Sequence, residues 1–299
     1  MVLSLAFLCA CAALSRAGEE TLLLNSAGAS ILVVFPNPPP EPLRQQVKDW
    51  ITKASAAVSH YYQRYPVPAV KVTVNVRGLS GINSGRASGW NGANIAIAVG
   101  RATKVEQFNE DWIMTHEMVH LAFPSVDQSH HWIEEGLATY IEPIARLRVG
   151  QLTPEKVWGD MYDGMVNGLP ETGDRGLDYT PTWGRTYWGG AMFCLFADVG
   201  IRERTHNQKG LENALRAILR EKGNIQTEAR LTDLLETGDA ATGVPVLTSL
   251  YHEWAGKPVT PDLRSFWRDL GVSKDGNNVR FDDTARLASI RYAIGKGGP

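Results

Sequence analysis

The chain has 299 residues, enough to bury a substantial core as one large domain or two smaller ones. Thirty basic and thirty-two acidic residues give a net charge of −2, which excludes the strongly basic surface typical of nucleic-acid-binding proteins. A hydrophobic content of 43% is ordinary for a soluble globular protein. We therefore expect a globular protein without a nucleic-acid partner.

The N-terminus predicts export. An apolar run ending at Leu14 is too short to span a bilayer, and Ser15-Arg16-Ala17 offers small residues where a signal peptidase needs them. Residues 1–17 are then a signal peptide, and the protein is secreted or periplasmic. In a second interpretation, L-C-A-C before Ala12 is a bacterial lipoprotein processing site, and a lipidated Cys11 is the only membrane anchor. An unprocessed chain is the third.

Strand and helix patterns alternate between the leader and residue 100. Apolar residues recur at helical spacing in one segment, and valines alternate with polar residues in the next, as in a half-exposed strand. A stretch rich in Gly, Ser and Asn follows, which is typical of a loop. The predicted elements are a strand or hairpin at Thr21–Phe35, a stiff connector at Pro36–Pro42, a helix at Leu43–Tyr65, a strand at Ala69–Val76, the loop at Gly78–Asn94 and a strand at Ile95–Val99.

The most informative motif is H-E-x-x-H at residues 116–120. In a helix, His116 and His120 lie one turn apart on the same face, where their imidazoles can share one metal ion. Glu117 is adjacent to His116, so its carboxylate reaches a water on that ion without being a ligand. The motif predicts a metal site only if the segment is helical.

Local signals predict that it is. Asn109 is a favoured N-cap, and Glu110 and Asp111 place negative charge in the first turn, where the helix dipole favours it. Pro124 stops the helix. The predicted helix is about a dozen residues long, a typical length.

A second segment, W-I-E-E-G-L-A-T-Y-I-E at residues 132–142, offers a further ligand. It is predicted to be a helix that ends or kinks at Pro143. Glu134 and Glu135 point about 100° apart on a helix, so only one faces the metal. Glu142 lies about two turns after Glu135 on the same face, where it can hydrogen-bond and orient a ligating imidazole. We therefore choose Glu135 as the ligand and expect Glu134 to be solvated.

Two histidines, one glutamate and an open fourth position form the ligand set of a hydrolytic zinc centre. The residues therefore predict one Zn²⁺ held by His116, His120 and Glu135. Zinc lowers the pKa of a bound water from about 15.7 to about 7, and Glu117 is expected to serve as the general base. This chemistry predicts a zinc metallopeptidase.

The two segments resemble the gluzincins, the metallopeptidases in which a downstream Glu completes H-E-x-x-H. Residues 132–142 are similar to the W-L-x-E-G-x-A-x-Y-x-E segment of the aminopeptidase N and glycyl aminopeptidase families, whose Glu before the Gly is the third zinc ligand. The resemblance implies that role for Glu135. The sequence Y-W-G-G-A beginning at Tyr187 resembles their Y-x-x-G-x segment, which implies that Tyr187 donates a hydrogen bond to the tetrahedral intermediate. The resemblance covers roughly residues 90–220.

The sequence departs from those families in two ways that bear on its expected substrate specificity. Only fourteen residues separate His120 from Glu135, fewer than in the aminopeptidase N family. No G-x-M-E-N segment, which holds the substrate's free amino group in the aminopeptidases, precedes the H-E-x-x-H motif. The closest description is a minimal gluzincin peptidase domain at residues 18–299 that acts on a peptide or protein, without a defined exopeptidase specificity.

The expected fold class is α+β, a thermolysin-like zincin. A small mixed-sheet lobe with the zinc helix spans residues 18–125, and a helical lobe spans 126–299. In gluzincins the strand before the zinc helix is the sheet edge on which a peptide substrate pairs, so Ile95–Val99 is either that edge or an ordinary core strand. Helices of the second lobe are predicted at Pro154–Val166, Thr186–Gly200, Leu211–Glu221 and Thr227–Glu236, with a last layer around Trp254, Phe266 and Trp267.

Two other function classes remain open: an envelope protein that binds zinc and peptides without turnover, and a hydrolase of a non-peptide amide or ester. The presence of Glu117 disfavours the first, because a binding-only site needs no base. Cys194 is predicted to be a buried thiol that behaves as a small hydrophobe. His130 and His131 either line the cleft or are loop residues without a special role.

Overall fold

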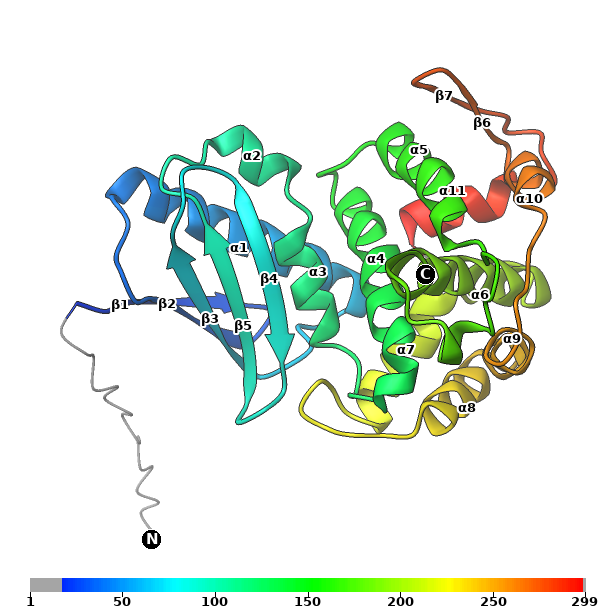
Figure 1. Cartoon of the computed structure of the whole chain (residues 1–299), viewed down its shortest axis with the longest axis horizontal. Helices are drawn as coiled ribbons and strands as arrows, with labels where there is room; N and C mark the ends of the chain where they lie inside the picture. The colour runs from blue at the N-terminus through cyan, green and yellow to red at the C-terminus, as the bar shows by residue number, and fades with distance from the viewer. Residues whose placement is uncertain (1–17, 298–299) are drawn as a thin grey trace, which may run out of the picture.

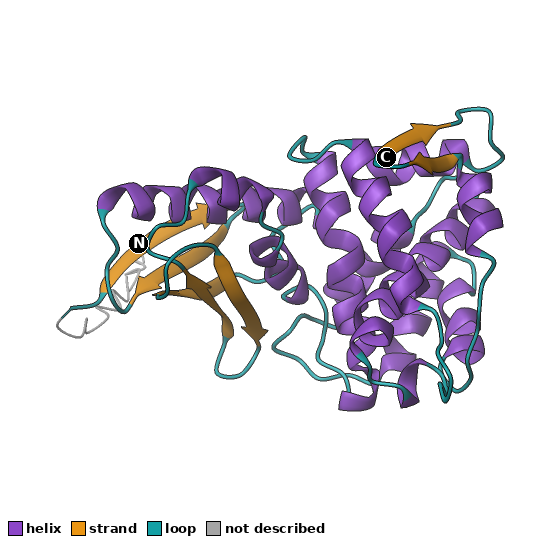
Figure 2. Cartoon of the chain, turned by 45° about the horizontal axis from the view of Figure 1, so that its top comes forward, coloured by secondary structure: helices purple, strands orange, loops and turns teal. Residues whose placement is uncertain are grey.

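The computed structural model describes residues 18–297 of the chain. The predicted signal peptide and Cys11 lie outside the described residues. A mixed five-stranded sheet with helices packed on it forms one side of the molecule, and a group of helices forms the other (Figures 1 and 2). Within the described chain, no helix has both the length and the apolar character needed to cross a bilayer.

The sheet begins with the predicted hairpin, in which β1 (Glu20–Ser26) pairs antiparallel with β2 (Ala29–Phe35). β3 (Ala69–Val76) is parallel to β2, and β5 (Ala93–Val99) is parallel to β3. β4 (Ile82–Ser88) pairs antiparallel with β5. The strand order is therefore β1-β2-β3-β5-β4, which makes β4 one edge of the sheet.

The strand β4 lies within the segment predicted to be a loop, and that prediction is wrong. Apart from Ile82, its residues I-N-S-G-R-A-S are small or polar, and all remain at least partly exposed. β4 is a strand because it forms hydrogen bonds with β5, and its own residues show no hydrophobic alternation that would predict it. Of the two roles left open for Ile95–Val99, the structure has the core strand, because β5 lies between β3 and β4.

α1 (Glu41–Tyr62) runs along the sheet (Figure 1). Pro42 lies in its first turn, where the missing N–H costs no helical hydrogen bond. Its buried stripe, which includes Val47 and Ile51, belongs to the same core cluster as the alternating valines of β3. The helical and strand periodicities read from the sequence are confirmed here.

Two short helices replace the single zinc helix that the sequence predicts. α2 (Val105–Glu110) and α3 (Ile113–His120) are separated at Asp111. The Asp111 carboxylate accepts hydrogen bonds from a backbone N–H in the first turn of α3 and from the Trp50 indole on α1. Asn109 lies inside α2, so its predicted role as the N-cap of the zinc helix is wrong. Asp111 instead satisfies the first turn and ties it to α1.

The helical side is built around α4 (His131–Arg148) and α6 (Gly190–Arg204). The sequence predicted that the helix ends or kinks at Pro143; α4 continues through this proline, so the first alternative is wrong. Buried residues lie on both sides of Pro143, and their packing outweighs the backbone hydrogen bond that the proline lacks. The remaining elements are α5 (Pro154–Gly164), α7 (Leu211–Glu221), α8 (Leu231–Thr242), α9 (Val246–Trp254), α10 (Leu263–Leu270), β6 (Val272–Asp275), β7 (Asn278–Phe281) and α11 (Ala288–Lys296).

A close crossing of α4 and α6 positions the site. A π-helical turn, Gly184–Gly189, leads directly into α6. A Cβ added to Gly136 of α4 would lie 2.4 Å from the Cα of Gly190, so this approach of two backbones requires glycine. The crossing brings Glu135, the residue before Gly136, close to the turn that carries Tyr187. Cys194, further along α6, is buried and free, as predicted.

Candidate metal centre

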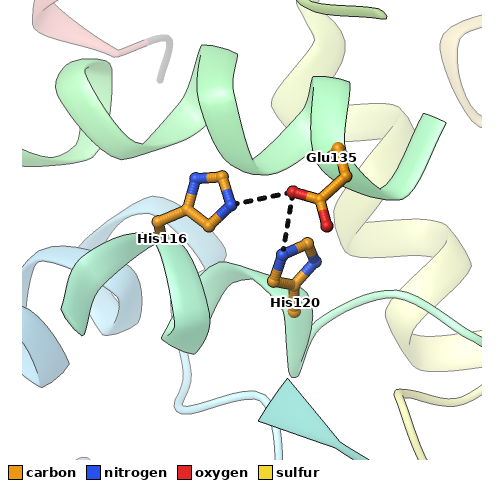
Figure 3. A group of neighbouring side chains, drawn as sticks. All are labelled: His116, His120 and Glu135. Atoms are coloured by element: carbon orange, nitrogen blue, oxygen red, sulfur yellow. Dashed lines mark hydrogen bonds and ion pairs between the residues drawn. The ribbon is translucent and has the colours of Figure 1, made fainter. Parts of the chain in front are cut away.

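The three predicted ligands come from two helices and converge at one point (Figure 3). Glu135 Oε2 lies 3.1 Å from His116 Nε2 and 3.6 Å from His120 Nε2. Zinc bonds of about 2.0–2.1 Å in a tetrahedron separate neighbouring ligand atoms by about 3.3 Å. The two measured distances lie on either side of that value. Two imidazoles and one carboxylate thus have the donor types of a zinc site, and the distances from the carboxylate to both imidazoles are close to the tetrahedral spacing.

The local fold explains this convergence. His116 and His120 are four residues apart on α3, so their rings lie on one face, with centroids 4.9 Å apart. α4 packs against α3 and supplies Glu135 from a segment that follows in sequence. Within residues 18–297, this is the one group of three or more His, Cys, Asp or Glu side chains with ligand atoms close enough to hold a metal ion.

The ionisation states of His116 and Glu135 suit a cation, whereas at His120 burial is outweighed by the effect of the Glu135 carboxylate, which raises the pKa. Burial lowers the pKa of His116 to about 4, so its imidazole is neutral. Burial opposes ionisation of Glu135, yet hydrogen bonds from His116 and His120 hold the pKa of its carboxyl well below the usual range. Metal binding requires a neutral imidazole and an ionised carboxylate, and these are the forms that both groups adopt at neutral pH.

Glu117 lies beside the three ligands without joining them. Its carboxylate accepts a hydrogen bond from the backbone N–H of Ala87 in β4, and burial raises the pKa of this carboxyl above its usual value. A Cβ on Gly85 would lie 2.7 Å from Glu117 Cγ, so glycine in β4 leaves the space that the side chain occupies. A raised pKa brings a carboxylate closer to the operating range of a general base.

Tyr187 also reaches the site, from the π-helical turn. Its ring stacks near the His116 imidazole, with the centroids 6.3 Å apart and the planes at 20°. Burial and the nearby Glu135 carboxylate raise the pKa of Tyr187 to about 12. The phenol therefore keeps its proton at neutral pH and can donate a hydrogen bond.

These groups line a cleft of about 1280 Å³ between β4, α3 and α4. A smaller cavity of about 580 Å³ adjoins it, because Trp112, His116 and Tyr187 line both. Trp183 and Trp188 give the smaller cavity an aromatic wall. The candidate metal centre thus lies on the wall of an open space large enough for an extended chain.

Glu142 has a different partner from the one expected. Its Oε1 accepts a hydrogen bond of 2.7 Å from Arg146 Nη1, one turn further along α4. No hydrogen bond links it to His116 or His120 in the described residues. The i,i+4 spacing favours the pairing with Arg146. Burial raises the pKa of Glu142 to about 7.

Sequence reasoning left open whether His131 lines the cleft, which it does, but missed its contacts with two glutamates and assigned Glu134 to solvent. His131 Nδ1 lies 2.9 Å from Glu134 Oε2, and His131 Nε2 lies 3.3 Å from Glu135 Oε1. Hydrogen bonds to Glu134 and Glu135 raise the pKa of His131 to about 10. The signal for this contact was the i,i+3 and i,i+4 spacing of the three residues. His130 points elsewhere and pairs with Asp178.

No family model and no curated protein matches the sequence. Solved structures do match the fold. An aminopeptidase N family protein from Idiomarina loihiensis has a TM-score of 0.61 and 13% identity, over 85% of this chain and 49% of that one. An M1 zinc metallopeptidase from Deinococcus radiodurans has a TM-score of 0.52 and 16% identity, over 81% and 53%. A variant of the latter enzyme, bound to a Tyr-Ser-Ala substrate, has a TM-score of 0.53.

At these identities the likeness shows a shared fold. The five-stranded mixed sheet with its helical part is similar to the peptidase domains of M1 zinc metallopeptidases. The chain spans about half the length of these structures. Their names supply a precedent for a zinc site in this fold.

Proposed function

We propose that this chain is a zinc-dependent peptide hydrolase of the gluzincin type. The observation that carries the proposal is the convergence of His116, His120 and Glu135 beside Glu117, which is not one of the three. A structural zinc site is closed by four protein ligands, whereas a catalytic site keeps a position open. Here three ligands face a cleft. The M1 enzyme with a bound Tyr-Ser-Ala substrate is a precedent for peptides in this fold.

In the proposed reaction, His116, His120 and Glu135 hold the zinc ion. When bound, zinc acts as a Lewis acid and lowers the pKa of a coordinated water to about 7. Glu117 accepts the proton of the attacking water and passes it to the leaving amine. Tyr187 donates a hydrogen bond to the carbonyl oxygen as negative charge develops on it.

We further propose that an extended peptide pairs with the free edge of β4. This strand lines the cleft along its length, and within residues 18–297 no other strand pairs with its outer edge. Edge strands accept extended peptides through main-chain hydrogen bonds, which carry no sequence specificity. Peptide pairing was one of two roles left open for Ile95–Val99, and we now propose it for the neighbouring strand β4. We retain secretion, or a lipid anchor at Cys11, as the proposed localisation.

Removal of the metal tests the proposal. We expect the purified protein to contain one zinc ion per chain and to hydrolyse members of a peptide library. Dialysis against a chelator should abolish hydrolysis, and zinc, but not magnesium, should restore it, because magnesium prefers an octahedral set of oxygen ligands. Parallel assays with ester and non-peptide amide substrates distinguish a peptidase from a hydrolase of non-peptide amides or esters. A protein that binds zinc and cleaves nothing would be the binding-only alternative.

Tyr187→Phe tests the proposed hydrogen bond. The substitution keeps the ring beside His116 and removes only the hydroxyl. We expect kcat to fall by about 100- to 1000-fold, the range for loss of one donor to a developing oxyanion, with little change in KM. Tyr292→Phe, at an exposed tyrosine on α11, is the matched control. An unchanged kcat in Tyr187→Phe would remove this residue from the mechanism.

A further inference from the structure

Both ring nitrogens of His131 are directed at carboxylates. His131 is the first residue of α4, and its side chain is 42% exposed at the cleft. Nδ1 lies 2.9 Å from Glu134 Oε2, and Nε2 lies 3.3 Å from Glu135 Oε1. Each ring nitrogen therefore contacts one carboxylate, so a single ring spans the two adjacent glutamates.

The two carboxylate oxygens of Glu135 contact different residues. Oε1 lies 3.3 Å from His131 Nε2, while Oε2 faces His116 Nε2 and His120 Nε2. Tyr187 also hydrogen-bonds the Glu135 carboxylate, but His131 is the partner that contacts Oε1 at 3.3 Å. We propose that His131 is a positioning residue, which holds Glu135 so that Oε2 alone is presented to the metal.

Glu134 completes this arrangement. Its Oε2 orients the His131 ring, and its Oε1 accepts a hydrogen bond of 3.4 Å from the backbone N–H of Val126. A chain of contacts thus runs from the loop after α3, through Glu134 and His131, to Glu135. In this arrangement Glu134 orients His131, and Glu135 binds the metal. Partners of this kind fix ligand orientation and typically contribute 10- to 100-fold to metal affinity.

The first test is the zinc affinity of His131→Leu, measured by competition with a chelator. This inference rests on the zinc site of the proposed function, but the measurement does not require turnover. We expect zinc binding to weaken by about 10- to 100-fold. The visible absorption of the cobalt(II)-substituted protein should also change, because release of Oε1 alters the coordination of Glu135. Without metal, the variant and the wild type should unfold at the same temperature.

Variants of Glu134 supply a second route. Glu134→Ala removes the acceptor for His131 Nδ1–H and should weaken zinc binding less than His131→Leu does. Glu134→Gln keeps an amide oxygen in that place and should bind zinc nearly as the wild type does. In the His131→Leu background, Glu134→Ala should cause no further loss, because its effect passes through the imidazole. His60→Leu, at an exposed histidine of α1, is the matched control.

The outcomes separate this inference from the proposed function. If the wild type binds zinc and cleaves peptides while His131→Leu keeps the same zinc affinity and cobalt spectrum, the positioning role is overturned and the peptidase stands. Additive losses in the double variant would show that Glu134 does not act through His131. A wild-type protein that binds no zinc would overturn both.

Discussion

Glu117→Gln should lower kcat for peptide hydrolysis by about 100- to 10,000-fold, the usual contribution of a positioned general base. The substitution preserves the size of the side chain and an oxygen that can accept the hydrogen bond from Ala87. It removes only the capacity to take a proton. Because Glu117 is not among the three converging ligands, zinc content should remain at one ion per chain. Steady-state kinetics and metal analysis of the same sample provide the measurement.

A control shows whether a loss belongs to this carboxylate. Glu253→Gln makes the same chemical change on the exposed surface of α9 and should leave kcat at the wild-type value. If Glu117→Gln retains wild-type activity, the peptidase mechanism fails. If it loses zinc together with activity, Glu117 belongs among the ligands, and its role as a base is not supported.

Glu135→Gln should have the largest effect on metal binding. Its Oε2 lies 3.1 Å from His116 Nε2 and 3.6 Å from His120 Nε2, and the substitution replaces an anionic ligand with a neutral amide. We expect zinc affinity to fall by more than about 100-fold, beyond the range for residues that only orient ligands. Chelator competition on the purified variant measures this loss. Activity at limiting zinc should fall in parallel, whereas excess zinc should restore part of it.

Glu134→Gln is the matched comparison, because it makes the same change one residue away. Its zinc affinity should stay near the wild-type value, since the amide oxygen still accepts the hydrogen bond from His131. Equal losses in the two variants would show that the choice between the adjacent glutamates is wrong. A larger loss in Glu134→Gln would assign the ligand role to Glu134.

The features that depend on neighbours along the chain were predictable from sequence. The placement of His116 and His120 on one helical face needs only a helical backbone, because a four-residue spacing returns to the same face. The valines of β3 and the apolar stripe of α1 were found for the same reason. Glu135 is the third of the converging groups, and its selection also rested on the resemblance to gluzincins.

Other features depend on contacts between distant segments, and only the tertiary structure decided them. β4 is a strand because β5 supplies its hydrogen bonds, although its own residues are typical of a loop. Asp111 separates α2 from α3 because Trp50, from a different helix, approaches its carboxylate.

The sequence by itself determined which side chains could bind zinc, because ligand chemistry and helical periodicity are local properties. The tertiary structure decided how they are supported. Glu142 bonds to Arg146 instead of an imidazole, and His131 spans Glu134 and Glu135. Several partners lay within reach of each of these side chains along the helix. Packing of α4 against α3 and α6 selected among them, because it sets which side chains face the cleft and which are buried.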